Sequence, residues 1–403
     1  MSRTSRVALV AAVAFLAGLS LGQVARAAKR EGTSYRPLDV FAEVLAHVEN
    51  NYVEEVPEKE LVYGAIEGLV GKLDPHSTFM RPEVYRQLKE ETSGEFDGVG
   101  LELTVRADQI TVVSPIPDSP GERAGILPGD RLLQIDGTST RDFTLLDAIR
   151  KLKGAPGTRV TLQIMREGFQ APQDLTLLRD HIRTQSVEWR VLDRDAGLLY
   201  VRVKSFTDRT DRSLKRALEE GRTQLGHELG GLALDLRNNP GGLLDQAVRV
   251  SDRFLREGII VTTEGRGRGN REVEMAHGKE TEPDYPVVVL VNRGSASASE
   301  IVAGALQDHK RATILGTQSF GKGSVQTVID LSDGSGLKLT QARYYTPKHR
   351  SIHELGITPD VVVAESPPAA PPAGAAPADA QLARAAEVLR QSPRKAAAGG
   401  ARK

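Results

Sequence analysis

The chain has 403 residues, with 53 basic and 53 acidic side chains and no cysteine. Its length predicts two or three domains with a proper hydrophobic core. The balanced charge gives no support for a nucleic-acid partner, and the absence of cysteine excludes disulfides, cysteine lipidation and a thiol protease.

The first 28 residues have the order of a secretory signal. Two arginines precede an apolar run at residues 7–21, and small residues follow it up to Ala28. This order predicts export, with cleavage after Ala27. The apolar run is short for a membrane-spanning helix, and an uncleaved anchor is the alternative. We therefore expect an exported protein, periplasmic where the host has two membranes, with residues 1–27 removed or kept as an anchor.

Residues 37–93 are predicted to form a helical N-terminal region. Apolar side chains recur at helical spacing in residues 38–48 and again in residues 61–70. A turn separates them from a third helix that begins near Pro82. The two apolar faces are candidates for packing or for a dimer contact, and His76 is interpreted as a turn residue rather than a ligand.

A β-rich segment follows at residues 94–178. It opens on Gly98-Val99-Gly100-Leu101, continues with short strands, and contains the sequences AGILPGD and IDG. The order of these features resembles a PDZ domain. Successive backbone N–H groups of such a loop can hold the C-terminal carboxylate of a peptide, while the adjacent strand edge pairs with that peptide. We place Val99, Gly100 and Leu101 in this loop; the alternative is a turn that binds nothing.

From residue 179 to residue 363 the pattern changes to alternating strands and helices. Apolar runs predict strands at residues 198–203, 231–236 and 286–291, with a helical pattern after each. Such an α/β arrangement places its sites at the carboxyl ends of the strands. The second strand runs directly into the sequence RNNPGG, so this turn is expected at that edge.

Residues 364–403 are assigned to a linker and a tail. Residues 366–380 are rich in proline and alanine and cannot build a core. Residues 381–390 predict a short amphipathic helix, and a basic tail follows it.

The third predicted strand leads into the stretch that carries the chemistry. The turn between this strand and the next helix holds Ser295, Ser297 and Ser299. Free N–H groups and the positive end of the dipole at a helix N-terminus favour a developing oxyanion. Further on, Lys322 stands between two glycines, directly before an alternating run that predicts a strand. Together these residues suggest a Ser–Lys catalytic pair; the alternative is that the serines cap the helix and the lysine belongs to an ordinary loop.

Four motifs in this order, LDLRNNPGGLL, GSASASEI, FGKGSVQ and GITPDV, resemble a C-terminal processing peptidase, also called a tail-specific serine protease. The resemblance covers residues 37–363. It implies an α/β multidomain chain with a helical N-terminal region, a PDZ-like β-rich domain and a crotonase-like α/β protease core. It also implies that Ser297 is the nucleophile, that Lys322 is the general base, and that Gln326 orients the lysine.

The chemistry of these residues agrees with the resemblance. A lysine acts as a base only if desolvation lowers its pKa, and a loop entering an apolar strand is compatible with burial. Because side chains alternate along a strand, Gln326 is expected to lie on the same face as Lys322. Ala298, directly after the nucleophile, is the expected oxyanion donor. By resemblance, Gly242 is preferred to Gly241 as the second donor.

The resemblance implies protein or peptide substrates with exposed C-termini, no metal and no cofactor, a homo-oligomer and a possible adaptor protein. None of the eight histidines lies in a matching motif, and His309 and His353 are interpreted as surface residues. Three alternatives stay open: an inactive PDZ-bearing scaffold, a crotonase-type acyl-CoA enzyme, and a Ser–Lys amidase. The intact Ser297, Lys322 and Gln326 disfavour the first, and the PDZ segment disfavours the other two.

Overall fold

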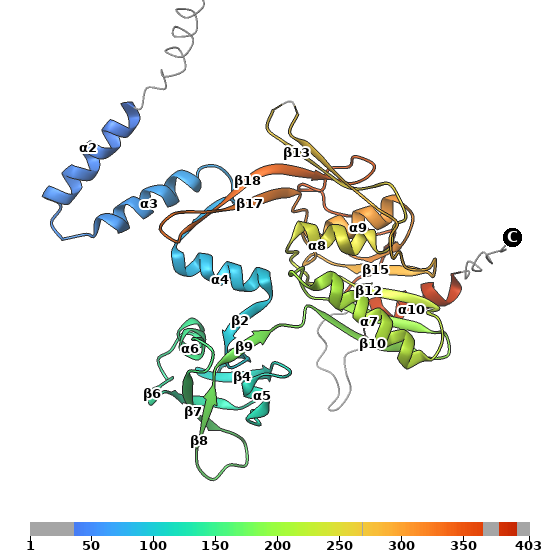
Figure 1. The fold of residues 1–403 in the computed structure, drawn as a ribbon, viewed down its shortest axis with the longest axis horizontal. Coiled ribbons are helices and arrows are strands. Elements are labelled where there is room, and N and C mark those ends of the chain that lie inside the picture. Colours follow the sequence, from blue (N-terminus) through green and yellow to red (C-terminus); the bar gives the residue numbers. More distant parts are fainter. Residues whose placement is uncertain (1–35, 268, 366–378, 393–403) are drawn as a thin grey trace, which may run out of the picture. The chain divides into compact units, whose positions relative to one another are not determined.

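The computed structural model describes residues 36–365, except residue 268, and residues 379–392 (Figure 1). The predicted secretory signal lies outside the described residues. The chain divides after Leu73 into two compact units, which are considered separately. Among the helices of the described ranges, none is both long and apolar enough to cross a membrane.

The first unit contains the helices α2 (Arg36–Asn51) and α3 (Glu58–Val70). Leu38, Phe41 and Val44 on α2 are 42–56% exposed. Such a face suits a contact between chains, and that use stays a prediction.

The expected helical region at residues 37–93 is divided between the two units. Residues 74–93 belong to the second unit, where they form β1 (Thr78–Met80) and α4 (Pro82–Ser93). The strand β1 pairs with β18 (Gly336–Tyr345), which explains why residues 74–93 belong to the second unit. No strand was expected at this position, because three residues give too short a pattern to recognise in the sequence.

The β-rich segment forms a PDZ-like domain. Its elements are β3 (Leu101–Arg106), β4 (Gln109–Pro115), α5 (Pro120–Arg123), β5 (Arg131–Ile135), β6 (Thr138–Ser139), α6 (Leu145–Leu152), β7 (Arg159–Met165) and β8 (Gln173–Leu178). The strand order β3-β4-β5-β7-β8 leaves β3 at an edge, and β6 pairs with β5. A separate ribbon, β2 (Glu95–Gly98) paired with β9 (Asp180–Arg183), leads into and out of this domain.

Two sheets build the remainder of the second unit. The first has the order β10-β11-β12-β15-β16-β19. Its elements are β10 (Val187–Asp193), β11 (Leu198–Val203), α7 (Thr210–Leu225), β12 (Gly231–Asp235), α8 (Leu244–Asp252), β15 (Val287–Val291), α9 (Ala298–Asp308), β16 (Thr313–Gly316), β19 (Val361–Val362) and α10 (Ala380–Gln391). The second sheet contains β1, β18, β13 (Ile259–Gly265), β14 (Arg271–Met275) and β17 (Ser324–Asp330). The strand β14 lies within residues 264–284, for which only a loop was expected.

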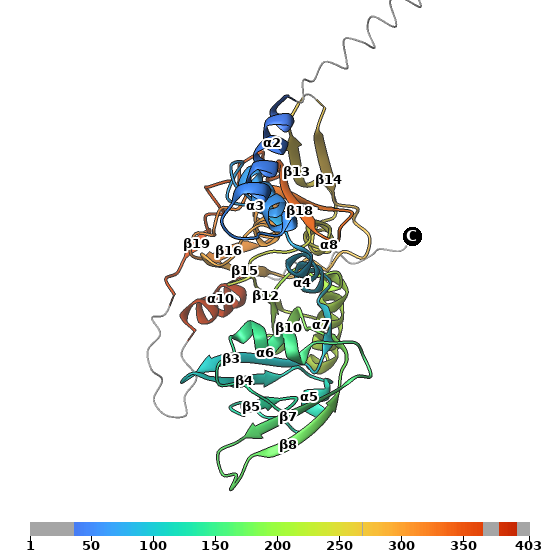
Figure 2. The same cartoon turned by 90° about the vertical axis from the view of Figure 1, so that its left-hand side faces the viewer.

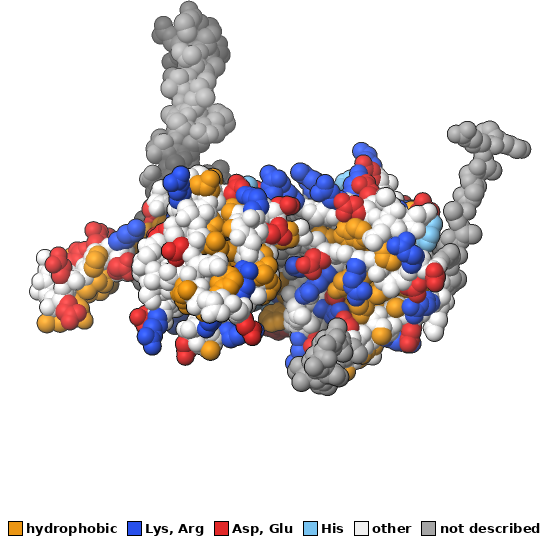
Figure 3. Space-filling model, turned by 90° about the horizontal axis from the view of Figure 1, so that it is seen from below, with side chains coloured by type: hydrophobic (Ala, Val, Ile, Leu, Met, Phe, Trp, Pro, Cys, Tyr) orange, Lys and Arg blue, Asp and Glu red, His pale blue; other side chains and the backbone are white. Residues whose placement is uncertain are grey.

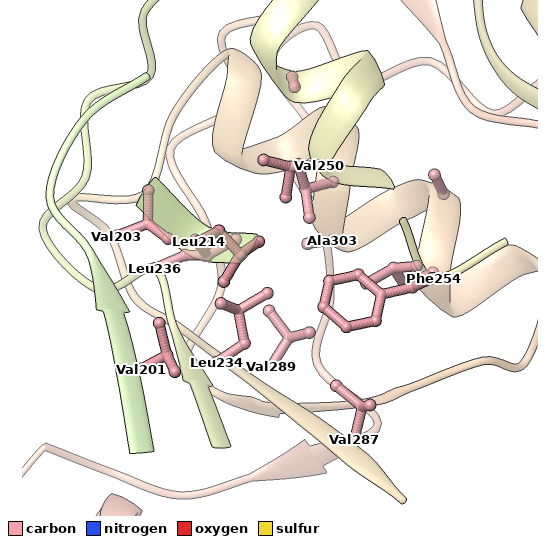
Figure 4. Packing of buried hydrophobic residues seen from close by; sticks show 14 of the residues in the cluster. Val201, Val203, Leu214, Leu234, Leu236, Val250, Phe254, Val287, Val289 and Ala303 are labelled. Atoms are coloured by element: carbon pink, nitrogen blue, oxygen red, sulfur yellow. The ribbon is translucent and has the colours of Figure 1, made fainter. Parts of the chain in front are cut away.

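The first sheet is buried on both faces. Every residue of β12 and β15 is buried, as the continuous apolar runs of central parallel strands require. Because side chains alternate, Leu234 and Val289 pack on the side of α7, α8 and α9, where Phe254 also lies (Figure 4). The neighbouring side chains of the same strands face α10, which packs against β12, β15 and β16 (Figure 2). The α/β class predicted from the sequence is therefore confirmed.

Candidate active site

Ser297 lies at the start of α9, where the strand–turn–helix unit predicted from the sequence meets the carboxyl edge of the first sheet. Its backbone has φ 54° and ψ −113°, a conformation that residues with a side chain rarely adopt. Such strain persists only where surrounding contacts enforce it, and it concentrates at functional sites.

The two neighbouring serines have structural partners. The Ser295 hydroxyl donates to the carbonyl oxygen of Leu236 over 2.7 Å, and the Ser299 hydroxyl donates to the carbonyl oxygen of Asn239 over 3.0 Å. Both side chains are fully buried, whereas Ser297 is 8% exposed. Within the residues that the structure describes, the Ser297 hydroxyl has no comparable backbone acceptor. The geometry therefore distinguishes Ser297 from the serines beside it.

Glu300 connects the nucleophile turn to the lysine loop. One carboxylate oxygen accepts from the backbone N–H groups of Ser297 and Lys322, over 2.8 and 2.9 Å. The other accepts from the Ser319 hydroxyl over 2.6 Å and from the Gly321 N–H over 2.7 Å. Glu300 has no exposed area, and burial raises its pKa although these four donors oppose the rise.

Sequence reasoning missed Glu300. A serine followed three residues later by a glutamate is the pattern of a helix capping box, and it could have been found. That pattern predicts only the bond to the Ser297 N–H. The bonds to the lysine loop arise from the tertiary fold.

Lys322 lies on the loop before β17, and its side chain is partly buried. Burial lowers the pKa of its ammonium from the usual 10.5, and the positive charge of Lys338 lowers it further, while Glu300 acts in the opposite direction. A lowered pKa is what a lysine base requires. In the described part of the chain, no hydrogen bond or ion pair engages the Lys322 ammonium, and none joins it to the Ser297 hydroxyl.

Tyr344 is a second neighbour of Ser297 that the sequence did not indicate. Burial raises the pKa of Tyr344 to about 12, and the nearby Ser297 side chain acts in the opposite direction. The Tyr344 N–H also donates to the Gly323 carbonyl oxygen over 2.7 Å, directly beside the lysine. The tyrosine therefore stays protonated and contacts both halves of the site.

Gln326 lies on β17, and its contacts differ from those expected. Its amide nitrogen donates to the Ser324 hydroxyl over 2.7 Å and weakly to the Thr340 hydroxyl over 3.4 Å. The alternation argument assumed a regular strand from Lys322 onward. The strand begins only at Ser324, and the pairing with β18 is irregular between Val325 and Gln326. The role of Gln326 in orienting the lysine stays a prediction.

The glycine turn that contains the candidate donor Gly242 meets the segment of Ser297 through Gly241, while Gly242 itself lies against Phe206. A side-chain carbon added to Gly241 would lie 2.9 Å from the Ser297 Cβ and 3.1 Å from the Ala298 nitrogen, so the two loops are in direct contact. The Gly241 N–H donates to the Asn239 side chain over 2.9 Å. The hydrogen bonds of the described residues leave the N–H groups of Gly242 and Ala298 without an acceptor, which favours these two as donors.

Two histidines approach the lysine loop. His76 lies in the turn before β1, half-buried, and burial and the charge of Lys322 lower its pKa. Its backbone N–H donates to Asp74 over 2.8 Å, so it is a turn residue as expected, but one in electrostatic range of Lys322.

The two histidines that were interpreted as surface residues have different surroundings. His353 is also half-buried, and its backbone nitrogen contacts Gly323 closely. The imidazole of His309 bonds to the carbonyl oxygen of Ile259 over 2.7 Å.

The predicted carboxylate loop of the PDZ-like domain has its carbonyl groups turned inward. The Val99 carbonyl oxygen accepts from the Gly121 N–H over 2.8 Å, and that of Gly100 accepts from the Ile116 N–H over 2.9 Å. In a trans peptide the N–H of the next residue points the opposite way, so those of Gly100 and Leu101 point away from these donors. Gly100 has φ 71°, and any side chain there would overlap Ser119.

The surface carries basic and acidic side chains interspersed over the face seen in Figure 3.

Within the described residues, no group of three His, Asp or Glu side chains could hold a metal ion.

A PDZ domain joined to an α/β core, with a strained serine at a helix N-terminus and a partly buried lysine beside it, is the arrangement of a serine-type peptidase. Sequence profiles agree: that of peptidase family S41 matches residues 197–363, and that of the PDZ domain matches residues 111–166. A third profile, the N-terminal domain of the activating protease CtpB, matches residues 16–84.

Curated relatives fix the family. A carboxy-terminal-processing protease of Bartonella bacilliformis is 45% identical over 341 residues, which span 84% of this chain and 77% of that protein. A carboxyl-terminal-processing protease of Synechocystis is 41% identical over 336 residues, 82% of this chain and 77% of that protein. The chain belongs to the C-terminal processing peptidases of family S41.

Similarity to a solved structure supports the fold but not the function. A Bacteroides fragilis protein assigned to the S41 proteases superimposes with a TM-score of 0.52 and 16% identity, over 80% of this chain and 90% of that one.

Proposed function

We propose that this protein is an exported serine endopeptidase in which Ser297 is the nucleophile and Lys322 the general base. The observation that carries the proposal is the Glu300 carboxylate, which binds the backbone N–H groups of both residues. This contact fixes the two segments relative to each other. A Ser–Lys pair is one of the known variants of nucleophile–base catalysis.

In the proposed reaction, the neutral Lys322 amine accepts the proton of the Ser297 hydroxyl as Oγ attacks the carbonyl carbon of a peptide bond. The N–H groups of Ala298 and Gly242 donate to the oxyanion that forms. The carbon–nitrogen bond then breaks, and the protonated lysine returns its proton to the leaving amine. Water hydrolyses the resulting acyl-enzyme, with the lysine again acting as base.

The absence of a bond between Lys322 and Ser297 is compatible with this role. Catalytic hydrogen bonds are often long in unliganded enzymes and shorten only when substrate binds. Gln326 is proposed to orient the lysine once substrate is bound.

The PDZ domain is proposed to recognise the C-terminal tails of protein substrates. A tail would add a strand to the free edge of β3, near α6, with its carboxylate on the N–H groups of the loop at Val99, Gly100 and Leu101. The CtpB-type N-terminal profile favours an additional partner that activates the enzyme. Association of copies is proposed separately, from the exposed apolar side chains of α2. Export to the periplasm is proposed from the signal order of the first residues.

Degradation of an unfolded reporter with an apolar C-terminus tests the catalytic assignment. We expect wild type to cleave it, and Lys322→Ala to lower the rate by about 10²–10⁴-fold, the usual contribution of a general base. The exposed Lys348 supplies the matched control, and Lys348→Ala should cleave normally. Cleavage by Lys322→Ala at the wild-type rate would remove the lysine from the mechanism.

The pH dependence of the reaction should reveal the base. Because only neutral Lys322 accepts a proton, kcat/KM should rise with pH along a limb whose midpoint lies below 10.5, the usual lysine pKa. The positive charge of Lys338 contributes to the lowered pKa of Lys322. Lys338→Gln should therefore move this limb to higher pH. A limb that stays in place, or moves to lower pH, would contradict the assignment.

A further inference from the structure

The C-terminal helix α10 is fixed to the core at both ends. Its N-cap residue, Asp379, accepts a hydrogen bond from the Leu382 N–H over 2.9 Å. The apolar face of α10 covers β12, β15 and β16, with Leu389 2% exposed. At the far end, Arg390 donates to Asp193 over 2.8 and 3.0 Å. The S41 profile ends at residue 363, before this helix begins.

The N-terminus of α10 binds the first residue of the RNNPGG turn. One terminal nitrogen of Arg237 donates to Asp379 over 2.9 Å and to Gln381 over 3.0 Å, and the other donates to Asp379 over 2.7 Å. Both the Nε and a terminal nitrogen of the same guanidinium bind Asp235 at the end of β12. The Arg237 side chain is only 16% exposed. The two carboxylates therefore bind adjacent edges of this guanidinium and share one of its terminal nitrogens.

The turn that Arg237 begins leads directly to the candidate oxyanion donors. Asn238 exchanges hydrogen bonds with Asn292: its N–H donates over 2.8 Å, and its side-chain oxygen accepts over 2.9 Å. The carbonyl oxygen of Asn239 accepts from the Ala296 N–H and from the Ser299 hydroxyl. The turn is thus held by the nucleophile segment on one side and by α10 on the other.

We propose that α10 is a positioning element of the active site, in which Asp379 acts through Arg237 to hold the turn carrying Gly241 and Gly242 against Ser297. The inference rests on the proposed function, because it assigns this turn to the oxyanion site. Donors stabilise an oxyanion only when they are placed accurately before the reaction, and a shift of 1 Å can cost on the order of 10²-fold in rate.

The charge of Asp379 can be removed without removing its helix cap. Asparagine is as good an N-cap as aspartate, so Asp379→Asn keeps the bond to the Leu382 N–H and weakens only the contact with Arg237. Arg390→Gln is the matched control, because it breaks an ion pair of the same helix at the end far from the turn. Arg237→Lys, alone and combined with Asp379→Asn, tests whether the effect passes through the arginine.

We expect Asp379→Asn to lower kcat for a peptide substrate about tenfold, with KM unchanged. Arg390→Gln should leave kcat within about twofold of wild type. The melting temperatures of the two variants show how far each substitution loosens the helix. The double variant Arg237→Lys with Asp379→Asn should be no slower than Arg237→Lys alone.

Two results would overturn the inference: a wild-type kcat in Asp379→Asn, or an equal loss of kcat in Arg390→Gln, which would make docking of the helix as a whole responsible. Failure of the proposed function looks different. In that case wild type would not cleave, or its cleavage would survive replacement of Ser297.

Discussion

Ser297→Ala should lower peptide hydrolysis by about 10⁴–10⁶-fold, to the level left by the oxyanion donors and substrate binding alone. The reason is that no other hydroxyl replaces it: those of Ser295 and Ser299 already donate to backbone carbonyl oxygens in a fully buried environment. Single-turnover cleavage of the reporter measures the loss, and circular dichroism checks that the variant is folded.

Ser295→Ala and Ser299→Ala are the matched controls. Ser299→Ala removes the bond to the Asn239 carbonyl oxygen, whereas Ser295→Ala removes the bond to the Leu236 carbonyl oxygen and the one accepted from the Asn292 N–H. Each lost bond costs about 1–2 kcal/mol of stability, but the proposed nucleophile stays in place. We expect both to keep measurable activity below their melting temperatures. Cleavage that survives in Ser297→Ala and disappears in either control would transfer the nucleophile to the neighbouring serine.

Glu300→Gln should impair stability and catalysis together. Each carboxylate oxygen of Glu300 accepts from two donors, so either orientation of a glutamine amide turns its NH₂ group toward two donors. We expect the unfolding free energy to fall by about 2–4 kcal/mol, as for other buried charged hydrogen bonds that lose their acceptor. We also expect kcat/KM to fall at least about 10²-fold, because the segments of Ser297 and Lys322 are no longer joined.

Denaturant titration followed by the fluorescence of Trp189 measures the stability change, since this is the only tryptophan of the chain and it lies on β10 of the first sheet. Glu354→Gln is the control: its side chain is 85% exposed and lies beyond the lysine loop. A Glu300→Gln variant with normal stability and activity would show that the carboxylate does not hold the site together.

Much of the fold could be predicted from the sequence because its signals are local. The apolar run before the serine turn predicted a buried strand, and β15 has that position. The glycine-rich loop and the order of strands after it indicated the PDZ domain, which the family profile confirms. The amphipathic pattern near the C-terminus predicted α10 to within one residue at each end.

Contacts between distant segments were beyond the sequence. The expectation that Gln326 shares a face with Lys322 assumed regular alternation, and the irregular pairing of β17 and β18 removes that basis. Residues 74–93 were grouped with the preceding helices because three-residue strands leave no periodic signal, yet β1 pairs with β18. His76 was interpreted from its turn alone, and the sequence did not indicate that Lys322 lies close enough to lower the pKa of His76.

The sequence by itself determined most of the elements, the family and the three residues proposed for catalysis, because periodicity and motifs are properties of short segments. Only the tertiary structure decided which groups meet. Glu300 joins the serine turn to the lysine loop, the Tyr344 N–H donates to Gly323 beside the lysine, and Asp379 reaches Arg237 across 142 residues of sequence. Buried polar groups must find partners wherever the fold brings them, and sequence spacing does not record those partners.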